Sequence, residues 1–273
     1  MKRRRSSLLL HLGLVLTAVL TLAPLVWMVS ASFMAPGAAN TLPPPLLPKA
    51  PTFEHYVMLF TRLNLLRALF NSLLIAGTTT AISMFLNALA GYAFAKLRFP
   101  GRERVFSWLV VGLVVPAQVG MLPLFLMIKG MGLVNTPGGV IITGLASIFG
   151  IFLIRQYALG IPDDLLDAAR VDGASEFAIF RRIVLPLMGP ILVTLGAFIF
   201  LGTWNDFLWP LIVLSDQAQL TLPVALASLV GEHVQDTELM MAGAVVTVIP
   251  VLVLFLAVQR AYIRGVMMGS VKG

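Results

Sequence analysis

The chain has 273 residues, of which 59% are hydrophobic and 11% charged, and its mean hydropathy is +0.95. Soluble domains carry about 25% charged residues, so this composition indicates an integral membrane protein. The absence of cysteine excludes disulfides and thiolate metal sites, and three widely spaced histidines indicate no metal site. The formal net charge of +7 would suit a nucleic-acid partner, but the basic residues flank apolar segments, which argues against one.

The N-terminal segment combines basic residues at positions 2–5 with a long apolar run over residues 8–32. A secretory signal peptide has the same order of features, but its apolar core is only about 7–15 residues long. A membrane-spanning helix needs roughly 20 apolar residues. We therefore expect residues 8–32 to form a retained first span with a kink at Pro24, and a signal peptide is the alternative.

Residues 33–69 are expected to form a loop between the first and second spans. The prolines at 43–45 favour an extended, stiff backbone in its first half. The second half, over residues 53–66, alternates aromatic and polar residues and predicts a short helix on the membrane surface. We expect His55 to lie at the surface of that helix rather than to bind a ligand.

Further apolar segments have the length of a membrane span. They lie at residues 70–95, 105–128, 138–157, 187–214 and 239–262. Together with the first, they predict an all-α integral membrane protein with six transmembrane helices in a single domain over residues 1–273. The one long polar passage in the chain, over residues 158–186, separates the fourth and fifth spans.

The distribution of lysine and arginine predicts the orientation of these spans. With a cytoplasmic N-terminus, only Lys49, Arg62, Arg67 and Lys129, of the 19 basic residues, would lie outside. Cytoplasmic loops carry an excess of lysine and arginine, so both termini are expected in the cytoplasm. The same argument places the polar passage at 158–186 on the cytoplasmic side.

The polar passage predicts a helix, a turn and a second helix. Asp163 and Asp164 are expected to cap the first helix, and Gly173 suits a left-handed residue just after it. Ser175 is expected to cap the second helix, with Glu176 in its first turn. Such short helices are marginal alone and need a surface to pack against.

Two apolar features of this passage indicate how it would pack. Phe177, Phe180 and Ile183 or Val184 recur at helical spacing and predict one apolar face. The Ala168-Ala169 pair, with Gly173, predicts a thin edge that enters a cleft on another protein.

A motif with fixed spacing runs through the passage. Asp167-Ala168-Ala169 is followed after three residues by Gly173 and after nine more by Ile183-Val184-Leu185-Pro186. This motif resembles the cytoplasmic loop of permease subunits from binding-protein-dependent ABC importers, where the pattern begins Glu-Ala-Ala. The aspartate in place of glutamate keeps the charge and shortens the reach. An ordinary solvated loop would account for the charges but not for the glycine and Leu-Pro at these distances.

The resemblance implies a type I ABC importer permease with a cytoplasmic helix-turn-helix coupling loop in the bacterial cytoplasmic (inner) membrane. It implies a heterodimer with a second permease subunit, two ATPase subunits inside and a solute-binding protein outside, and transport by alternating access. The residues that it implies at the ATPase contact are Asp167, Ala168, Ala169, Arg170, Asp172, Gly173, Phe177, Leu185 and Pro186. The sequence has no P-loop and no nucleophile with a base, so we expect no catalytic site or cofactor here and ATP hydrolysis by the partners.

The few polar residues inside the spans are candidates for a translocation path or for contacts between helices. Gln118 lies between two prolines of the third span, and Asn205 and Asp206 follow Trp204 in the fifth. For these three residues, a path and a packing or interfacial role both remain open. For Asn87 in the second span, we expect a contact between helices.

The last part of the chain resembles maltose-type permeases, in the Trp204-Asn205 region, in the loop 215–238 and in the tail 259–273. The resemblance implies a carbohydrate substrate, contact of the tail with the ATPases and contact of the loop, through Glu232 and Asp236, with the binding protein. A surface helix is the alternative for that loop. An ABC permease for a non-sugar solute remains an alternative function, and so does a self-contained secondary transporter, although only Asp206 would serve it as an intramembrane carboxylate.

Overall fold

The computed structural model describes residues 2–61, 64–232 and 236–270, with side chains described over 10–61, 64–228 and 236–259. Every regular element in these residues is helical, which confirms the expected all-α class. The chain divides into two compact units, one formed from Met1–Leu66 and Ala225–Pro250 and the other from Arg67–Val224 and Val251–Gly273. Each unit is described by itself.

The helices of membrane-spanning length follow the predicted order. Among the described residues, four segments are long and apolar enough to cross a membrane: Leu10–Ala31, Leu65–Lys96, Pro137–Leu159 and Thr237–Gln259. Two helix pairs meet the same criteria together but are sharply bent. If each bent pair is one span, the total is the six that the apolar segments predict.

The two bent pairs differ from the uninterrupted spans expected at 105–128 and 187–214. Arg102–Val114 and Ala117–Gly130 meet at 99°, and Glu176–Leu187 and Gly189–Trp204 meet at 80°. Pro116 stands in the first break and Pro190 at the start of the helix after the second. A proline removes a backbone donor and clashes with the preceding turn, which is the usual cause of such a break.

The first unit contains α1 (Lys2–Ala31), η1 (Ala38–Asn40), α2 (Glu54–Thr61), most of α13 (Leu222–Glu232) and the first part of α14 (Thr237–Ser270). Its small core is formed by Ala31, Met34 and Ala39, against which Trp27 and Met241 pack. Helix α2 is the short helix expected within residues 53–66.

His55 of α2 is buried, so the expected surface position is wrong. Its side chain is 2% exposed, and its Nε2 lies 2.9 Å from the backbone oxygen of Met34. The rings of Phe33, Phe53 and Tyr56 pack together, and the centroid of the Phe33 ring lies 5.3 Å from the ring centroid of each of the other two. The imidazole is therefore held inside the unit by the backbone at Met34 rather than exposed to solvent.

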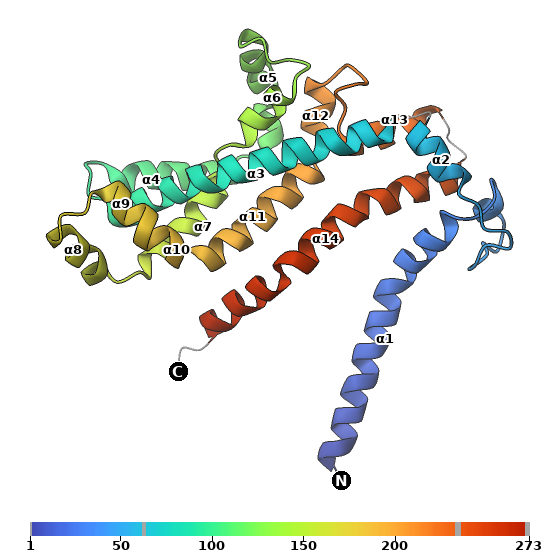
Figure 1. Ribbon diagram of the computed structural model, residues 1–273, viewed down its shortest axis with the longest axis horizontal. Coiled ribbons are helices and arrows are strands. Elements are labelled where there is room, and N and C mark those ends of the chain that lie inside the picture. The colour runs from blue at the N-terminus through green and yellow to red at the C-terminus, as the bar shows by residue number, and fades with distance from the viewer. Residues whose placement is uncertain (1, 62–63, 233–235, 271–273) are drawn as a thin grey trace. The chain divides into compact units, whose positions relative to one another are not determined.

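The second unit is built on the long helix α3 (Leu65–Lys96), most of which belongs to it. The other elements follow in chain order (Figure 1): α4 (Arg102–Val111), η2 (Gly112–Val114), η3 (Ala117–Gly120), α5 (Met121–Gly130), α6 (Pro137–Ile141), η4 (Ile142–Gly144), α7 (Ile148–Leu159), α8 (Asp163–Val171), α9 (Glu176–Ile179), the π-helical turn η5 (Phe180–Val184), α10 (Leu185–Leu187), α11 (Gly189–Trp204) and α12 (Leu208–Val213). Helix α7 packs against α4 and α11, and α12 packs against α5 and α6.

Two apolar cores hold this unit together. One gathers Ala88, Tyr92, Ile154, Phe180 and Leu195, and so joins α3 and α7 to the segment that follows α8. The other gathers residues of α3, α5, α6 and α12, among them Ile75, Ile128 and Trp209. The first core lies beside the polar passage and includes Met188 at the second bend, whereas the second core includes residues of α5, which follows the first bend.

Asn87 joins α3 to the start of α7. Its side chain is fully buried, donates to Ser83 Oγ at 2.9 Å and accepts from the backbone N–H of Ser147 at 3.1 Å. A Cβ added at Gly150 would lie 2.8 Å from the Asn87 amide, so glycine is what allows the two helices to approach there. The expected role of Asn87 in helix contact is confirmed.

Candidate functional site

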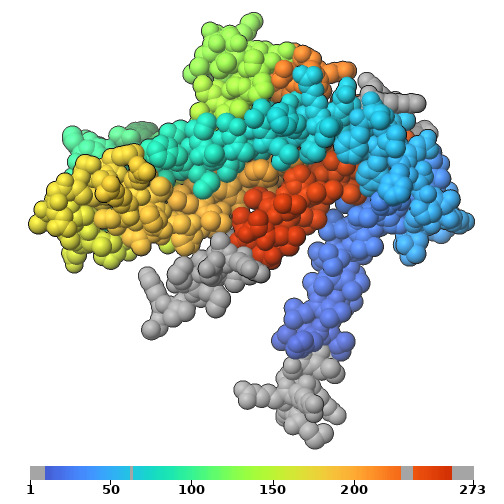
Figure 2. All heavy atoms as spheres, in the orientation of Figure 1, coloured from blue at the N-terminus to red at the C-terminus, as the bar shows by residue number. Residues whose placement is uncertain are grey.

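The polar passage forms the expected helix, turn and helix, at one end of the second unit (Figure 2, yellow). The predicted N-cap role of Asp163 and Asp164 is wrong, because Pro162 occupies that position and makes no side-chain capping bond. Both aspartates instead lie in the first turn of α8, where their negative charges interact favourably with the positive end of the helix dipole.

The turn between the helices has the predicted chemistry. Gly173 has φ of +81°, its N–H donates to Arg170 O at 3.0 Å, and the N–H of Ala174 donates to Ala169 O at 3.0 Å. These bonds satisfy carbonyls at the end of α8, as glycine-terminated helices commonly do. Ser175 Oγ accepts from the N–H of Ala178 at 3.3 Å and so caps α9.

A polar chain holds the two helices together. Arg170 of α8 donates to Asp167 Oδ1 at 2.6 Å and to Glu176 Oε1 of α9 at 2.7 Å. Tyr92 of α3 donates its hydroxyl proton to Glu176 Oε2 at 2.9 Å. The hydrogen bonds and charge of Arg170 hold the pKa of Glu176 below its usual range. The chain therefore fixes α9 to both α8 and α3.

A second polar contact fixes the start of α8 to the end of α3. Lys96 Nζ donates to Ile161 O at 2.6 Å and to Asp163 Oδ1 at 2.6 Å, and the lysine side chain is only 5% exposed. The hydrogen bond and charge of Lys96 hold the pKa of Asp163 below its usual range. We call the residues Tyr92, Lys96, Asp163, Arg170 and Glu176 the latch, because they attach the α8–α9 segment to α3.

The residues predicted at the ATPase contact divide by exposure into two groups, and we call the exposed residues the outer group and the half-buried ones the inner group. Asp167, Ala168, Asp172, Gly173, Phe177 and Pro186 are exposed, whereas Ala169, Arg170 and Leu185 are half-buried. Ala169 and Leu185 pack against the core beside the latch. Phe177 is 58% exposed while Phe180 and Val184 are buried, so the predicted apolar face is split between solvent and core.

Sequence reasoning missed Val171, whose side chain is 87% exposed at the end of α8. It also missed Tyr92 and Lys96, because both contacts cross more than 60 positions of the chain. The only signal was their place at the end of a span facing the polar passage.

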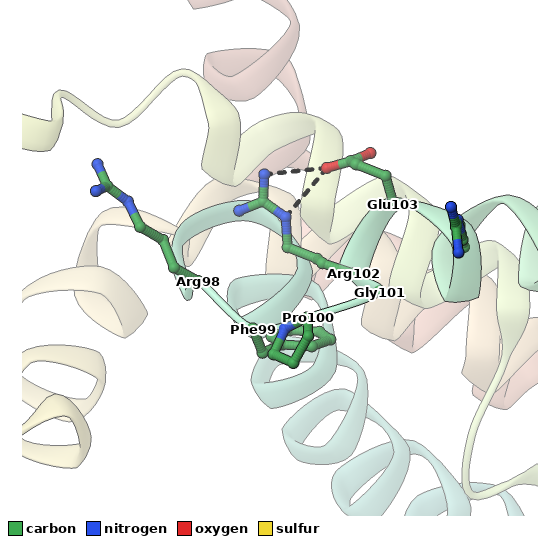
Figure 3. Close-up of a pocket in the computed structure, with 7 residues that line it drawn as sticks. Arg98, Phe99, Pro100, Gly101, Arg102 and Glu103 are labelled. Carbon is green, nitrogen blue, oxygen red and sulfur yellow. Dashed lines mark hydrogen bonds and ion pairs between the residues drawn. The ribbon is translucent and has the colours of Figure 1, made fainter.

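A cavity of about 680 Å³ lies beside the latch and has a charged lining. The turn from α3 to α4 contributes Arg98 and Arg102 to its lining. The same turn also lines a separate pocket formed by residues 98–104, where Arg102 pairs with Glu103 and Arg98 extends away from them (Figure 3). Glu103 also accepts from Arg155 of α7 at 3.0 Å, and that guanidinium lies 4.0 Å from the ring centre of Phe106. The ends of α3, α4 and α7 are thus cross-linked by charge next to α8.

A second cavity, of about 350 Å³, lies beside the bend at Pro116 and the gap between α11 and α12, and it brings Gln118 and Asp206 together. Asn205 does not line it, because its Nδ2 donates to Leu201 O of its own helix at 2.9 Å. Three threonines, at 79, 143 and 203, line the cavity and were not among the predicted residues. They are distributed over three elements, which their sequence positions alone do not bring together.

Of the residues predicted to contact a binding protein, Asp236 is described and the side chain of Glu232 lies outside the described residues. Asp236 Oδ1 accepts from the N–H of Leu239 at 2.9 Å and so caps α14. It also lies 3.7 Å from Nδ1 of the buried His55. The side chains of the tail from residue 260 on, including Arg260 and Arg264, likewise lie outside the described residues.

Comparison with known proteins gives consistent matches. Residues 87–267 match the model of the family described as "Binding-protein-dependent transport system inner membrane component". The chain is 37% identical over 283 residues to an arabinooligosaccharides transport system permease protein of Halalkalibacterium halodurans, with full coverage of both. It is 33% identical over 276 residues to a lactose transport system permease protein of Rhizobium radiobacter, covering 100% of this chain and 98% of that one.

A solved structure has the same fold. It is a bacterial ABC transporter involved in the import of the acidic polysaccharide alginate, and one of its chains matches with a TM-score of 0.81 at 24% identity. The match covers 95% of this chain and 97% of that chain. The family match alone covers well over half of the sequence, and the relatives match along its whole length. The chain therefore belongs to the inner-membrane component family of binding-protein-dependent transport systems.

Proposed function

We propose that this chain is the membrane-spanning subunit of an ATP-driven importer, and that it moves a carbohydrate across the cytoplasmic membrane by alternating access. The observation that carries the proposal is the α8–α9 segment, a small polar helix-turn-helix with an exposed outer group. The outer group offers Asp167, Ala168, Asp172 and Phe177 to a partner. The latch behind it would carry motion of the segment into α3.

The energy for transport comes from separate ATPase subunits. The sequence has no glycine-rich phosphate-binding loop ending in Gly-Lys, which P-loop ATPases require. We therefore assign ATP binding and hydrolysis to two partner subunits that dock on the outer group. A second permease subunit and an extracytoplasmic solute-binding protein, which Asp236 and its neighbours would contact, complete the assembly.

The carbohydrate assignment is supported by the relatives, which are named for arabinooligosaccharides and for lactose. The alternative within the same family is a non-sugar solute. Uptake by the reconstituted complex, measured with radiolabelled arabinotriose, lactose and maltotriose, tests the assignment. Uptake of at least one of them is expected, and uptake of none would overturn it.

The docking proposal is tested by crosslinking, which the absence of cysteine makes clean. Ala168→Cys places a single thiol on the outer group, and a short bifunctional maleimide–amine reagent should join it to an ATPase subunit in membranes. Leu42→Cys, an exposed position in the loop after α1, is the matched control and should capture no ATPase subunit. Capture from position 42 but not from 168 would overturn the docking role.

A further inference from the structure

The 350 Å³ cavity lies beside two interruptions of the helices, one at the bend of the Arg102–Gly130 pair and the other at the gap between α11 and α12. Gln118 belongs to η3, directly after the break at Val115–Pro116, and Asp206 lies in the gap between α11 and α12. Breaks free backbone polar groups that a membrane cannot satisfy, so irregular backbone at this depth is found where protein or a water-filled cavity surrounds it. The cavity is therefore a place within this chain where polar groups can meet water or a solute.

Its lining combines hydroxyl, amide and carboxylate groups with apolar walls. The full lining is Thr79, Ala117, Gln118, Met121, Leu124, Val140, Thr143, Gly144, Thr203, Asp206, Leu208 and Trp209. Small-molecule sites have this character, with volumes of roughly 300 to 1,000 Å³ and a few placed polar groups. At the lower end of that range, the cavity accommodates one terminal sugar residue rather than an extended oligosaccharide.

Two of the polar side chains have unused hydrogen-bonding capacity. Thr79 is 1% exposed, and its hydroxyl oxygen is buried with no hydrogen-bond partner among the described residues. The Gln118 side chain makes no hydrogen bond to another described residue; it is exposed and lines the cavity. A buried polar group left unpaired is destabilising, so a ligand hydroxyl that bonds to Thr79 would supply the missing partner.

In the part of the chain that the structure describes, the lining contains an acidic group and no basic one. Asp206 is its one ionisable residue, and neither lysine nor arginine occurs among the described residues that form it. Asp206 Oδ1 accepts from the N–H of Trp209 at 3.3 Å, which leaves further acceptor positions on the carboxylate. A second carboxylate brought into the cavity would be repelled by the first, and this repulsion is strong where water is scarce.

We propose that this cavity binds a sugar residue directly and admits only carbohydrates without negative charge. The inference rests on the carbohydrate transport proposed above and deepens it. Hydroxyls of a neutral sugar would donate to Asp206 and exchange hydrogen bonds with Gln118 and Thr79, whereas a uronate would bring a carboxylate against Asp206. The cavity thus makes this chain a determinant of substrate charge, whatever contacts a second permease subunit adds.

The first test measures uptake by the reconstituted complex with a neutral probe, arabinotriose, and an anionic probe, an alginate trisaccharide. Wild type should import the first and not the second. Asp206→Asn keeps a side chain that caps helices well and removes only the charge. It should raise the apparent KM for the neutral probe about threefold to tenfold, as the loss of a charged hydrogen bond does. The double variant Asp206→Asn/Gln118→Lys should gain uptake of the anionic probe.

Thr79→Val tests the buried hydroxyl, and Thr80→Val is its matched control. Thr80 is next along α3, but its hydroxyl donates to Ala76 O of the same helix at 2.6 Å and it does not line the cavity. We expect the first change to raise KM about threefold to tenfold and the second to leave it unaltered. If Asp206 served only to cap α12, Asp206→Asn would leave both KM and the charge preference unchanged, and this result would contradict the proposal.

Photoaffinity labelling gives a readout that needs no variant. A neutral oligosaccharide with a diazirine on its terminal residue should label peptides containing 117–124 or 203–209 of this chain. Labelling confined to the second permease subunit would overturn the inference, and so would wild-type uptake of the alginate trisaccharide in preference to arabinotriose. In either case the proposed function stands, whereas a complex that imports no carbohydrate overturns both.

Discussion

Gly173 is the residue on which the shape of the outer group most directly depends. Its φ of +81° lies in the left-handed region, and an added Cβ would have no heavy atom within 4 Å. The cost of Gly173→Ala is therefore backbone strain alone, about 1 kcal/mol. We expect the variant to insert and assemble normally. Its substrate-stimulated ATPase activity, measured in the reconstituted complex, should be severalfold lower than that of wild type.

Gly189→Ala is the control for this strain. Gly189 also has no heavy atom within 4 Å of an added Cβ, but it does not have a positive φ. Helix propensity favours alanine over glycine there, so activity should be unchanged. Equal losses in both variants would show that the left-handed turn is not the cause.

The contact between Lys96 and Asp163 predicts how the α8–α9 segment responds to pH. Because Lys96 lowers the pKa of Asp163 in the folded chain, the contact contributes stability above the ordinary carboxyl pKa of about 4 and loses it as the pH falls through the lower folded value. A spin label on Ala168→Cys should therefore keep the same mobility from pH 8 to pH 5 and become more mobile only below about pH 4.

Asp163→Asn separates this contact from the rest of the latch. Glu176, whose pKa is also lowered, titrates in the same acidic range and would add to the change. With asparagine at 163, the spin label should be more mobile at every pH, and the remaining transition should belong to Glu176. A mobility change centred between pH 5 and pH 8 would contradict the assignment to either carboxylate.

At the scale of elements, the buried amide of Asn87 determines how α3 meets α7. Asn87→Leu keeps most of the volume but leaves the N–H of Ser147 and the hydroxyl of Ser83 without this partner. Buried unpaired groups cost about 1–3 kcal/mol, so the melting temperature in detergent should fall by several degrees. Thr194→Val, which removes a hydroxyl bonded to Pro190 O of its own helix, should shift it far less.

The apolar segments predicted the order of the helices, because segment length and hydropathy are local properties. The two breaks were not predicted, although the sequence contains Pro116, because hydropathy carries no information on the direction of a helix axis. The bend at Met188, between α10 and α11, lies in the core where Met188 and Leu195 are buried together with Ile154 of α7. Such contacts are tertiary and cannot be derived from segment length.

The candidate site shows the same division. Gly173 and Ser175 were predicted correctly, because a left-handed turn and a helix cap are set within a few residues. Asp163 and Asp164 lie in the first turn of α8, one and two positions after the N-cap that Pro162 occupies, so their place near the helix start was predicted but not the cap itself. The partner of Glu176 on α3 could not be predicted, since Tyr92 reaches Glu176 across 84 positions of the chain.

For the whole molecule, the remaining question is which side of the membrane each loop faces. The predicted orientation puts both termini, the turn at Arg98 and the α8–α9 segment in the cytoplasm and the loop at Lys49 outside. Single cysteines at positions 49, 98 and 168 can be tested with a membrane-impermeant maleimide in spheroplasts. Lys49→Cys should react at once, and Arg98→Cys and Ala168→Cys only after the membrane is permeabilised.

The pair at 98 and 168 also decides what the sharply bent segment Arg102–Gly130 does. If it is a broken span, two crossings separate the positions, because Pro137–Leu159 supplies the other, and both cysteines react from the same side. If it turns back as a re-entrant loop, one crossing separates them and they react from opposite sides. We expect the same side, because a basic turn such as Arg98–Arg104 and a basic segment such as 155–182 are both retained in the cytoplasm by their charge. Opposite sides would leave five spans and place the two termini on different faces of the membrane.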